Sequence, residues 1–394
     1  MSYGRLVWVN LMRNKPRTLL TVASVFVALF LFCALWGVLD TLNSAIQIGS
    51  ETRMATRNAI SLVFPLPLAY RDRIAAVPGV RSVSWSNWFG GRDPNDPHGF
   101  FAQFAIDGAS YLPIYARDFA ITEASPAPPG TPVPAGMDPR LASFMMERTA
   151  AVVGDALMKK KGWKVGQTIH LDGTIYPGSW PFTIRAVYHP INPAMNADAM
   201  FFHWEYLNQN GMHDAGLVGV YVLELSDPSR AGQVARAVDA MFENSSAATK
   251  TETERAFQAG FVSMYGNIPF VLEVIGFAVV FSILLVAGNT MMSAFRERIA
   301  EIGVMKTLGF GDGTVFGLVL GEAAVITLLG GVPGALLARA LVTGLNLGVL
   351  PPMTVAPTTV MAGVGIAVGL GLLSGIVPAW QAARLRIVSA LRRA

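Results

Sequence analysis

Charged residues are scarce in this chain of 394 residues: they make up 14% of it, while hydrophobic residues make up 52% and the mean hydropathy is +0.44. A soluble globular protein carries about 25% charged residues, so part of this sequence is suited to lipid. The formal net charge of +4 is too small to indicate a nucleic-acid partner. Cysteine is nearly absent, and the one cysteine, Cys33, excludes an intrachain disulfide and leaves the redox compartment open.

Sequence motifs of enzymes are missing too. The sequence has no Gly-x-x-x-x-Gly-Lys-Ser/Thr loop to hold nucleotide phosphates, and neither a His-Glu-x-x-His nor a Gly-x-Ser-x-Gly motif. The histidines show no metal-ligand spacing; they are His98, His170, His189, His203 and His213. We therefore predict no catalytic residue, no metal and no cofactor on this chain. We interpret His203, in "FFHWEY", as a packed core residue.

Four long apolar runs are present. The first, residues 18–39, has about 22 residues without a charge, which as a helix would measure roughly 33 Å and cross the hydrocarbon core. It is too long for the apolar core of a cleaved signal peptide. The other runs cover residues 270–294, 315–341 and 358–377. The sequence therefore predicts an integral membrane protein with four transmembrane helices.

Basic residues indicate the orientation of these helices. They gather before the first run, between the second and third, and after the fourth: Arg13, Lys15, Arg17, Arg296, Arg298, Lys306, Arg384, Arg386, Arg392 and Arg393. If the helices alternate in direction, all three groups fall on one side, which the positive-inside rule assigns to the cytoplasm. We predict cytoplasmic termini, in a multi-pass membrane protein with its large domain extracytoplasmic.

The segments around the spans have their own patterns. Residues 1–17 are interpreted as an amphipathic helix on the inner leaflet, with Trp8 at the interface, and residues 378–394 as a cytoplasmic tail. Residues 342–357 are predicted to form an extracytoplasmic loop. Two glycine pairs at a spacing of four, Gly365 with Gly369 and Gly371 with Gly375, predict close helix packing in the fourth span.

Helical patterns flank the large insert between the first two spans. Residues 40–57 and 248–269 are predicted to be two stalk helices, each with an apolar stripe. The stripe residues that we expect to pack together are Leu42, Ile46, Phe257, Phe261 and Tyr265.

The insert itself alternates between strand and helix patterns. Residues 58–109 and 215–247 predict a split, ferredoxin-like subdomain that starts with a strand at "ISLVF". Residues 110–214 predict a β-rich subdomain inserted into it, in which the proline-rich segment 123–136 is a surface loop. The fold class is thus a four-helix membrane domain with a large mixed α/β extracytoplasmic domain on a helical stalk.

A charged helix is predicted between the second and third spans, in residues 295–314. Arg298 and Glu301 can pair at a spacing of three residues. Glu322 lies about seven residues into the third span, where an ionised carboxylate is costly, by about 2.5–3.5 kcal/mol at mid-membrane. We expect a structural partner for it, with Asn289 as the candidate; a proton relay is the alternative.

These features together resemble the FtsX-like, or MacB-like, permease family of bacterial ABC transporters. The resemblance rests on "NLMRNKPRTLLT", on "RERIAEIGVMKTLGFGDGTVFGLVLGEAAVITLLGGVPGALL", on "PAWQAARLRIVSALR", and on "LPLAYRDRIAAVPGVRSVS" and "VVGDALMKKKGWKVGQTIHL". The proline-rich segment departs from the family as an insertion. The resemblance implies that residues 295–314 couple to an ATPase. The residues concerned are Arg296, Arg298, Glu301, Ile302, Lys306, Leu308 and Gly309.

The resemblance also implies a location in the bacterial inner membrane, and it implies the partners. A separate cytoplasmic ATPase, in two copies, would bind the ATP and Mg²⁺, and this chain would form a homodimer or a heterodimer with a similar permease. The expected function is to transmit force from ATP hydrolysis to an amphiphilic cargo outside the membrane, such as a lipoprotein, lipid, peptide or drug. A periplasmic adaptor or substrate protein and membrane lipid are further partners. The alternative is a mechanical scaffold that moves no cargo and activates an extracytoplasmic partner such as a cell-wall hydrolase.

Overall fold

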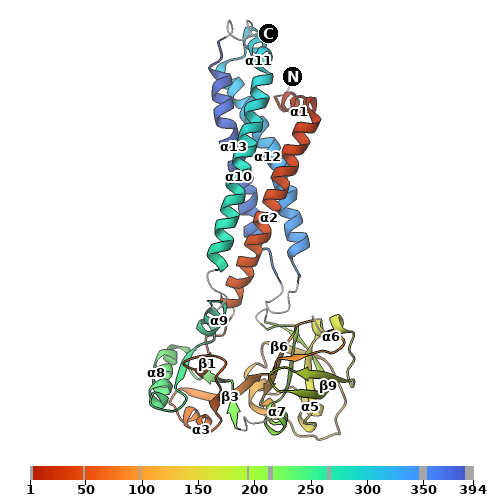
Figure 1. The fold of residues 1–394 in the computed structure, drawn as a ribbon, viewed down its shortest axis with the longest axis vertical. Helices are drawn as coiled ribbons and strands as arrows, with labels where there is room; N and C mark the ends of the chain where they lie inside the picture. Colours follow the sequence, from red (N-terminus) through yellow and green to blue (C-terminus); the bar gives the residue numbers. More distant parts are fainter. Residues whose placement is uncertain are drawn as a thin grey trace. The chain divides into compact units, whose positions relative to one another are not determined.

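The computed structural model of the chain describes residues 3–47, 49–96, 99–192, 195–211, 216–263, 268–345 and 353–386. It divides into two compact units (Figure 1). The helical unit comprises Met1–Thr41, Asn267–Leu345 and Pro352–Ala394, and the α/β unit comprises Leu42–Gly266 with Asn346–Pro351.

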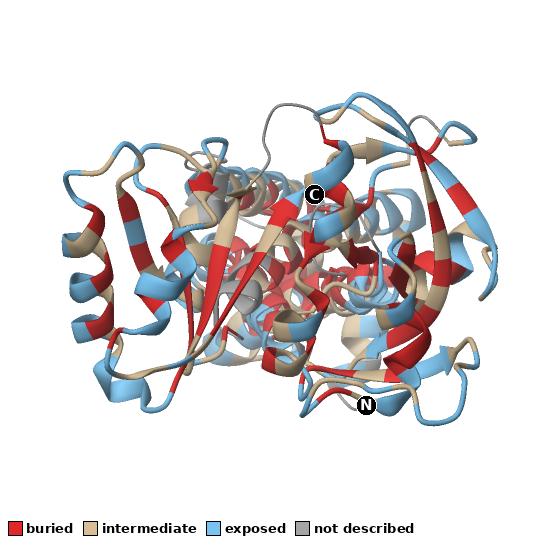
Figure 2. Ribbon diagram, turned by 90° about the horizontal axis from the view of Figure 1, so that it is seen from below, coloured by how far each residue is buried: buried red, intermediate tan, exposed pale blue. Residues whose placement is uncertain are grey.

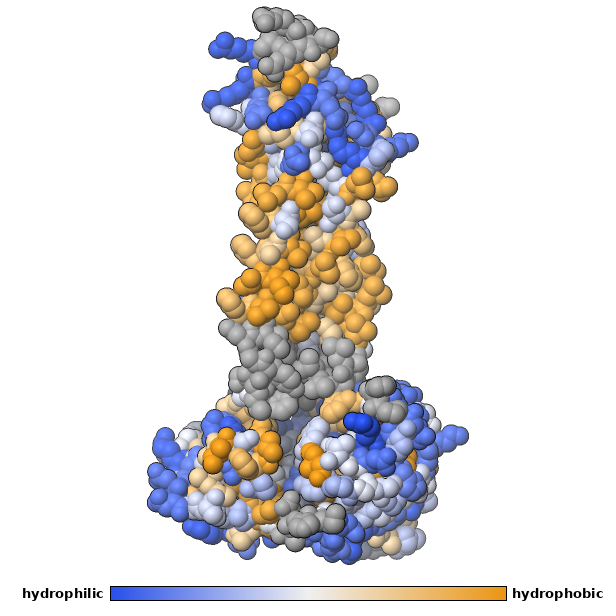
Figure 3. Space-filling view, viewed as in Figure 1, coloured by the Kyte–Doolittle hydropathy of each residue, from blue (hydrophilic) through white to orange (hydrophobic). Residues whose placement is uncertain are grey.

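The helical unit contains all four predicted spans. Its helices are α1 (Tyr3–Arg13), α2 (Lys15–Gln47), α10 (Ile268–Glu297), α11 (Ile299–Thr307), α12 (Asp312–Val342) and α13 (Pro357–Ala383). Within the described residues, four segments are long and apolar enough to cross a membrane, namely Lys15–Thr41, Pro269–Glu297, Asp312–Val342 and Pro357–Ala383. Hydrophobic residues cover the long helices, and hydrophilic ones gather around α1 and α11 (Figure 3). This confirms the four predicted membrane helices.

Glycines allow α12 to lie directly against the backbone of α2. A Cβ atom added at Gly330 would fall 2.5 Å from the carbonyl oxygen of Val22, and one at Gly334 would fall 2.5 Å from that of Phe26. Backbone atoms cannot move aside as a flexible side chain can. Glycine is therefore required at both positions for this close approach.

One of the two predicted glycine pairs on α13 has the same role. A Cβ atom at Gly371 would fall 2.7 Å from the Cα of Ala324 on α12, and Gly375 meets α12 equally closely, so this prediction is confirmed. The prediction for Gly365 and Gly369 is wrong within the described unit. Nothing lies within 4 Å of a Cβ at either position, because these glycines occupy another face of α13.

This difference provides a matched pair of variants. Gly330→Ala should lower the free energy of unfolding by about 1–3 kcal/mol, since the added methyl group would collide with the α2 backbone. Gly365→Ala should be neutral or slightly stabilising, because it meets open space and alanine favours the helix by about 0.5–1 kcal/mol. Thermal unfolding of both variants in detergent measures the difference; equal melting temperatures would contradict this packing.

The α/β unit is built on one large sheet. Its strands are β1 (Arg53–Asn58), β2 (Leu66–Pro67), β3 (Val80–Trp88), β4 (Gly91–Arg92), β5 (Ala102–Ile106), β6 (Phe119–Ala124), β7 (Ala150–Gly154), β8 (Thr168–Gly173), β9 (Gly178–Pro190), β10 (Ala199–His203), β11 (Leu217–Val218), β12 (Val220–Leu225) and β13 (Thr249–Thr253). The helices are α3 (Tyr70–Ala75), α4 (Gly108–Ile114), α5 (Ala142–Met146), α6 (Asp155–Lys161), α7 (Trp204–Asn210), α8 (Ala231–Phe242) and α9 (Glu254–Ser263). On α8 the buried residues recur once per turn, at Val234, Val238 and Phe242, so the helix has a buried face and an exposed face (Figure 2).

The strand order confirms the split, ferredoxin-like subdomain. The order is β13-β1-β12-β3-β5-β10-β7-β9-β8-β4, with β6 paired to β9 and a separate β2–β11 pair. Strand β12 lies between β1 and β3 and runs antiparallel to both, so the β1-α3-β3 unit is split by a strand from the end of the insert. The inserted part does not form its own sheet, because its strand β10 pairs with β5, which in turn pairs with β3. The proline-rich segment after β6 is a loop, as predicted.

The predicted start of this subdomain and the predicted stalk boundaries are wrong. The run "ISLVF" lies in a loop, where Ile60 and Val63 are 81% and 84% exposed. The strand is instead β1, within the stretch 40–57 that we predicted to be helical, and α2 ends at Gln47. The reason is that β1 pairs with β12 on one side and with β13 on the other. Across the β1–β13 pair, Arg57 donates a hydrogen bond to Glu252 at 3.1 Å.

The second predicted stalk helix, 248–269, also begins with a strand. β13 occupies its first residues, and its alternating threonines suit a sheet. The helix α9 starts at Glu254, after Thr253, whose hydroxyl oxygen accepts a hydrogen bond from the backbone nitrogen of Ala256 at 3.2 Å. Thr253 is therefore the N-cap of α9.

His203 packs in the core as predicted. Its ring stacks on Phe144, and its Nε2 lies 2.8 Å from the Phe144 carbonyl oxygen. Among the described residues, no three metal-ligating side chains are grouped. Burial lowers the pKa of His203 below its ordinary value, although the bond to Phe144 opposes the shift.

The low pKa of His203 predicts a pH dependence of stability. The unfolded chain takes up a proton as the pH falls through about 6.5, whereas the folded chain resists protonation, so the free energy of unfolding should fall as the solution becomes more acidic. Above that pH the contribution is fully present. Melting temperatures of the full chain and of His203→Gln between pH 8 and pH 5 test this; an equally steep decline in the variant would contradict it.

Candidate functional site

The candidate site is the short helix α11, which connects α10 to α12. It ends in a defined turn: the backbone nitrogen of Gly309 bonds the Lys306 carbonyl, and that of Phe310 bonds the Met305 carbonyl, both donors lying 3.1–3.2 Å from their acceptors. Gly309 has φ of +94°, the left-handed conformation that this helix ending needs. Gly309 therefore shapes the turn after α11.

One face of α11 is buried within the helical unit. Ile302 is 2% exposed and belongs to a cluster with Phe295 of α10, Val315 of α12 and Ala382 of α13. Ile299 and Met305 pack against the same cluster, as their spacing along the helix favours. Ile302, predicted as a coupling residue, thus attaches α11 to three neighbouring helices.

Lys306 also points inward. Its Nζ donates hydrogen bonds to the carbonyl oxygens of Ala383 and Leu385, at 2.5 and 3.0 Å, and lies 2.8 Å from the Asp312 carboxylate. Only 8% of its side chain is exposed. A cation at the end of α13 satisfies carbonyls that have no partner within the helix and complements the helix dipole. Lys306 therefore joins α11 to the end of α13.

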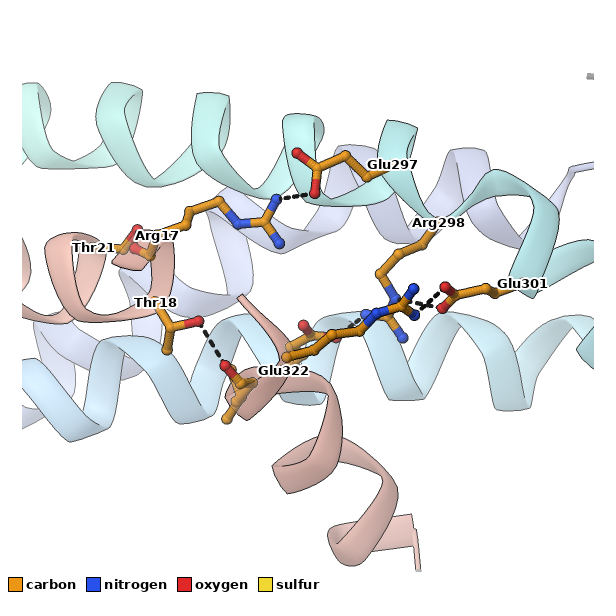
Figure 4. A network of polar contacts seen from close by, with 9 residues as sticks. Arg17, Thr18, Thr21, Glu297, Arg298, Glu301 and Glu322 are labelled. Atoms are coloured by element: carbon orange, nitrogen blue, oxygen red, sulfur yellow. Dashed lines mark hydrogen bonds and ion pairs between the residues drawn. The ribbon is translucent and has the colours of Figure 1, made fainter. Parts of the chain in front are cut away.

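A buried ion pair joins α11 to α12 (Figure 4). Arg298 Nη1 lies 2.7 Å from Glu322 Oε2, and the side chains are 15% and 10% exposed. The predicted pair of Arg298 with Glu301 is present at 3.5 Å. Asn289, the partner that we expected for Glu322, is exposed on α10, so that expectation is wrong. The reason is the turn after α10, which carries Arg298 back over α12.

Further ion pairs connect α1 and α2 to this region. Glu301 also pairs with Arg13 of α1, and Arg17 of α2 lies 2.7 Å from Glu297 of α10. Figure 4 shows Arg17, Glu297, Arg298, Glu301 and Glu322 in one polar network. Sequence reasoning missed the contacts of Arg13 and Arg17, because their carboxylate partners lie far along the chain.

The remaining surface of α11 points outward. Leu308 is 73% exposed and Val304 is 48% exposed, and Thr307 and Gly309 are exposed beside them. We call these four residues the outer face of α11. Arg296, on the last turn of α10, is exposed as well. Of the predicted coupling residues, the structure leaves Arg296, Leu308 and Gly309 accessible, and Val304 is an accessible residue that the sequence analysis missed.

The predicted stalk contacts fall mostly outside the described structure. Phe257 is half-buried on α9. The side chains of Leu42, Ile46 and Phe261, and all of Tyr265, lie outside the described residues, so their packing stays a prediction.

A buried ionic cluster in the α/β unit was not predicted. Arg53 of β1 lies 2.7 Å from Asp118 and 2.9 Å from Glu254 of α9, and its guanidinium stacks over Tyr115 at 4.4 Å. Burial would lower the pKa of Arg53, but the carboxylate of Glu254, followed by Tyr115 and Asp118, raises it. The cluster connects β1, the inserted part and α9.

Comparison with known proteins places both units in one family. The FtsX-like permease C-terminal family matches residues 273–387, and the MacB-like periplasmic core domain matches residues 18–241. The macrolide export ATP-binding/permease protein MacB of Nitrobacter winogradskyi is 31% identical over 187 residues, which cover 44% of this chain and 27% of that protein. The ABC transporter permease YtrF of Bacillus subtilis is 32% identical over 123 residues, covering 27% of this chain and 28% of that one.

The solved structures that match are more distant. The periplasmic region of MacB from Actinobacillus actinomycetemcomitans is 8% identical, with a TM-score of 0.38, and the alignment covers 55% of this chain and 95% of that one. The matched regions are about a quarter of the length of the curated relatives. The two family matches together extend over most of the chain. It belongs to the FtsX-like permease family with a MacB-like periplasmic core domain, and it is an inner-membrane protein with a large extracytoplasmic domain.

Proposed function

We propose that this chain is the membrane subunit of an ABC transporter, in which a separate cytoplasmic ATPase binds the ATP and Mg²⁺ and docks on the outer face of α11. The observation that carries the proposal is the division of α11 into two faces. One face is fastened to α12 and α13 through Ile302, Arg298 and Lys306, while Val304 and Leu308 project outward. A helix attached in this way moves its neighbours when a partner moves it.

The work is proposed to be done on the extracytoplasmic side. The four long apolar helices have few charged residues, which supports an amphiphilic cargo such as a lipoprotein, lipid, peptide or drug over a polar solute passing through a channel. MacB, one of the relatives, is named for macrolide export. We propose two copies of the ATPase on a dimer of this chain or of this chain with a similar permease, with a periplasmic adaptor or substrate protein as a further partner.

Purification tests the proposal. The full chain, isolated from its own host in mild detergent, should carry an ATPase with a phosphate-binding loop, identified by mass spectrometry, and the complex should hydrolyse ATP. A preparation without any ATPase would contradict the proposal. The same preparation, with envelope proteins added, distinguishes transport from the alternative function as a mechanical scaffold. Recovery of a cell-wall hydrolase would favour the scaffold, and recovery of a lipoprotein or lipid would favour transport.

A further inference from the structure

The α/β unit consists of two lobes that are joined through a narrow part of its sheet (Figure 1). The first lobe contains β1, α3, β12, α8 and β13, and the second contains β5 and the inserted part. Between them, β3 pairs with β5 over three residue pairs, whereas β12 pairs with β3 over six. A short pairing at the ends of two strands offers few hydrogen bonds that resist rotation. The β3–β5 pairing is therefore a candidate hinge.

The two faces of this sheet hold the lobes together in different ways. On one face, a single apolar cluster extends across both lobes and includes Met54 of the first with Phe182 and Phe202 of the second. On the other face, the apolar cluster is confined to β5 and the inserted part. Polar contacts close the junction on that face, such as the hydrogen bond between Ser110 of α4 and Ser84 of β3 at 2.8 Å.

A buried ionic cluster closes the junction on the same face. It consists of Arg53, Asp118, Glu254 and Tyr115, and we call it the Arg53 cluster. Tyr115 packs against the apolar cluster of that face, and the Arg53 guanidinium lies over its ring at 4.4 Å. Arg53 binds Asp118 at 2.7 Å and Glu254 at 2.9 Å, and the three charged side chains are only 9–14% exposed. Water therefore screens these ion pairs little.

Both carboxylates of the Arg53 cluster have a further donor from the inserted part. The Tyr115 hydroxyl donates to Glu254 at 3.3 Å, and the Asn192 side-chain amide donates to Asp118 at 3.0 Å. Charged groups that are buried, paired and hydrogen-bonded fix one arrangement of the elements that carry them. The Arg53 cluster thus fixes the inserted part against β1 and α9.

Glu254 also holds the chain segments that lead to the membrane helices. It is the first residue of α9, and after α9 only residues 264–267 precede α10. Its carboxylate accepts a hydrogen bond from the backbone nitrogen of Ser50 at 2.8 Å, in the segment between α2 and β1. Arg255 donates to the carbonyl oxygen of Gly49 in the same segment, at 3.0 Å. The connections to α2 and α10 are therefore fastened to each other at the Arg53 cluster.

We propose that the Arg53 cluster is a latch. When closed, as in this structure, it fixes the two lobes against each other; when α9 withdraws Glu254, the inserted part is free to turn about the β3–β5 pairing. The apolar core on the opposite face keeps the lobes attached in both states. Opening by a movement of α10 rests on the proposed function, but the latch itself is a property of this chain and is tested without the ATPase.

Distances between spin labels on the two lobes test the latch in the full chain, purified in detergent. The labels are attached at Asp72→Cys in α3 and Lys159→Cys in α6, where the side chains are 90% and 81% exposed, while Cys33 is buried. With the latch intact, we expect one narrow distance distribution. Glu254→Ala imitates withdrawal of the carboxylate and should widen the distribution at least twofold. Asp118→Ala breaks the latch from the inserted part and should do the same.

The matched control is Glu252→Ala. Glu252 is 12% exposed, against 14% for Glu254, and its ion pairs with Arg57 and Lys250 stay within the first lobe. This variant loses a similar ion pair but should keep the narrow distribution. A narrow distribution in both Glu254→Ala and Asp118→Ala would overturn the proposal. Equal widening in Glu252→Ala would overturn it too, because a general loss of stability would then explain the effect.

Discussion

Replacing Leu308 by aspartate should reduce the amount of ATPase that purifies with the chain at least tenfold. Leu308 is the most exposed apolar residue of α11, and apolar residues at the centre of an interface contribute about 2 kcal/mol or more when they anchor it. A carboxylate at this position would have to lose its hydration water when the ATPase docks. The measurement is the ratio of ATPase to membrane subunit after purification, followed by ATP hydrolysis per complex.

The control is the same chemical change on the other unit. Val63→Asp alters an apolar residue that is also strongly exposed, 84% against 73% for Leu308, but belongs to the α/β unit, and it should leave the ATPase content unchanged. The melting temperature of Leu308→Asp should match that of the unaltered chain, because this side chain makes few contacts within the described structure. Full retention of the ATPase by Leu308→Asp would show that docking occurs elsewhere.

Replacing Glu322 by leucine should destabilise the helical unit by about 3–5 kcal/mol, because it leaves the buried guanidinium of Arg298 without its main partner. Arg298→Met should have a cost of the same order for the converse reason. The double variant Arg298→Met with Glu322→Leu should recover most of the loss, since no unpaired charge is then buried. Thermal unfolding of the four proteins in one detergent completes the double-mutant cycle.

An exposed ion pair provides the comparison for this cycle. Arg140 pairs with Asp138 in the α/β unit at 2.6 Å, with its side chain 53% exposed, and Arg140→Met should change the melting temperature little. If the two single variants of the buried pair were as mild as Arg140→Met, the pair would not be a structural connection. A double variant no more stable than the singles would show that the loss does not come from the unpaired charge.

The membrane helices could be predicted because their signal is local. An uncharged run of sufficient length must form a helix in lipid, since every backbone polar group has to be satisfied within the segment. The split of the ferredoxin-like subdomain by the late strand β12 was also predictable, because β3, β12 and α8 each had their own periodicity, but its first strand, β1, was not. The strand expected at "ISLVF" failed for the opposite reason. Its apolar, β-branched residues favour a strand, but pairing with β12 and β13 selects the more polar β1.

The sequence by itself determined that this protein has four membrane helices, a large mixed α/β insert and a charged helix between the second and third spans. Only the tertiary structure decided which residues of that helix are available to a partner. Arg298, Ile302 and Lys306 are used within the helical unit, while Val304 and Leu308 are exposed. The physical reason is that burial and ion pairing depend on neighbours brought together by folding, such as Glu322 and the end of α13, which no local pattern specifies.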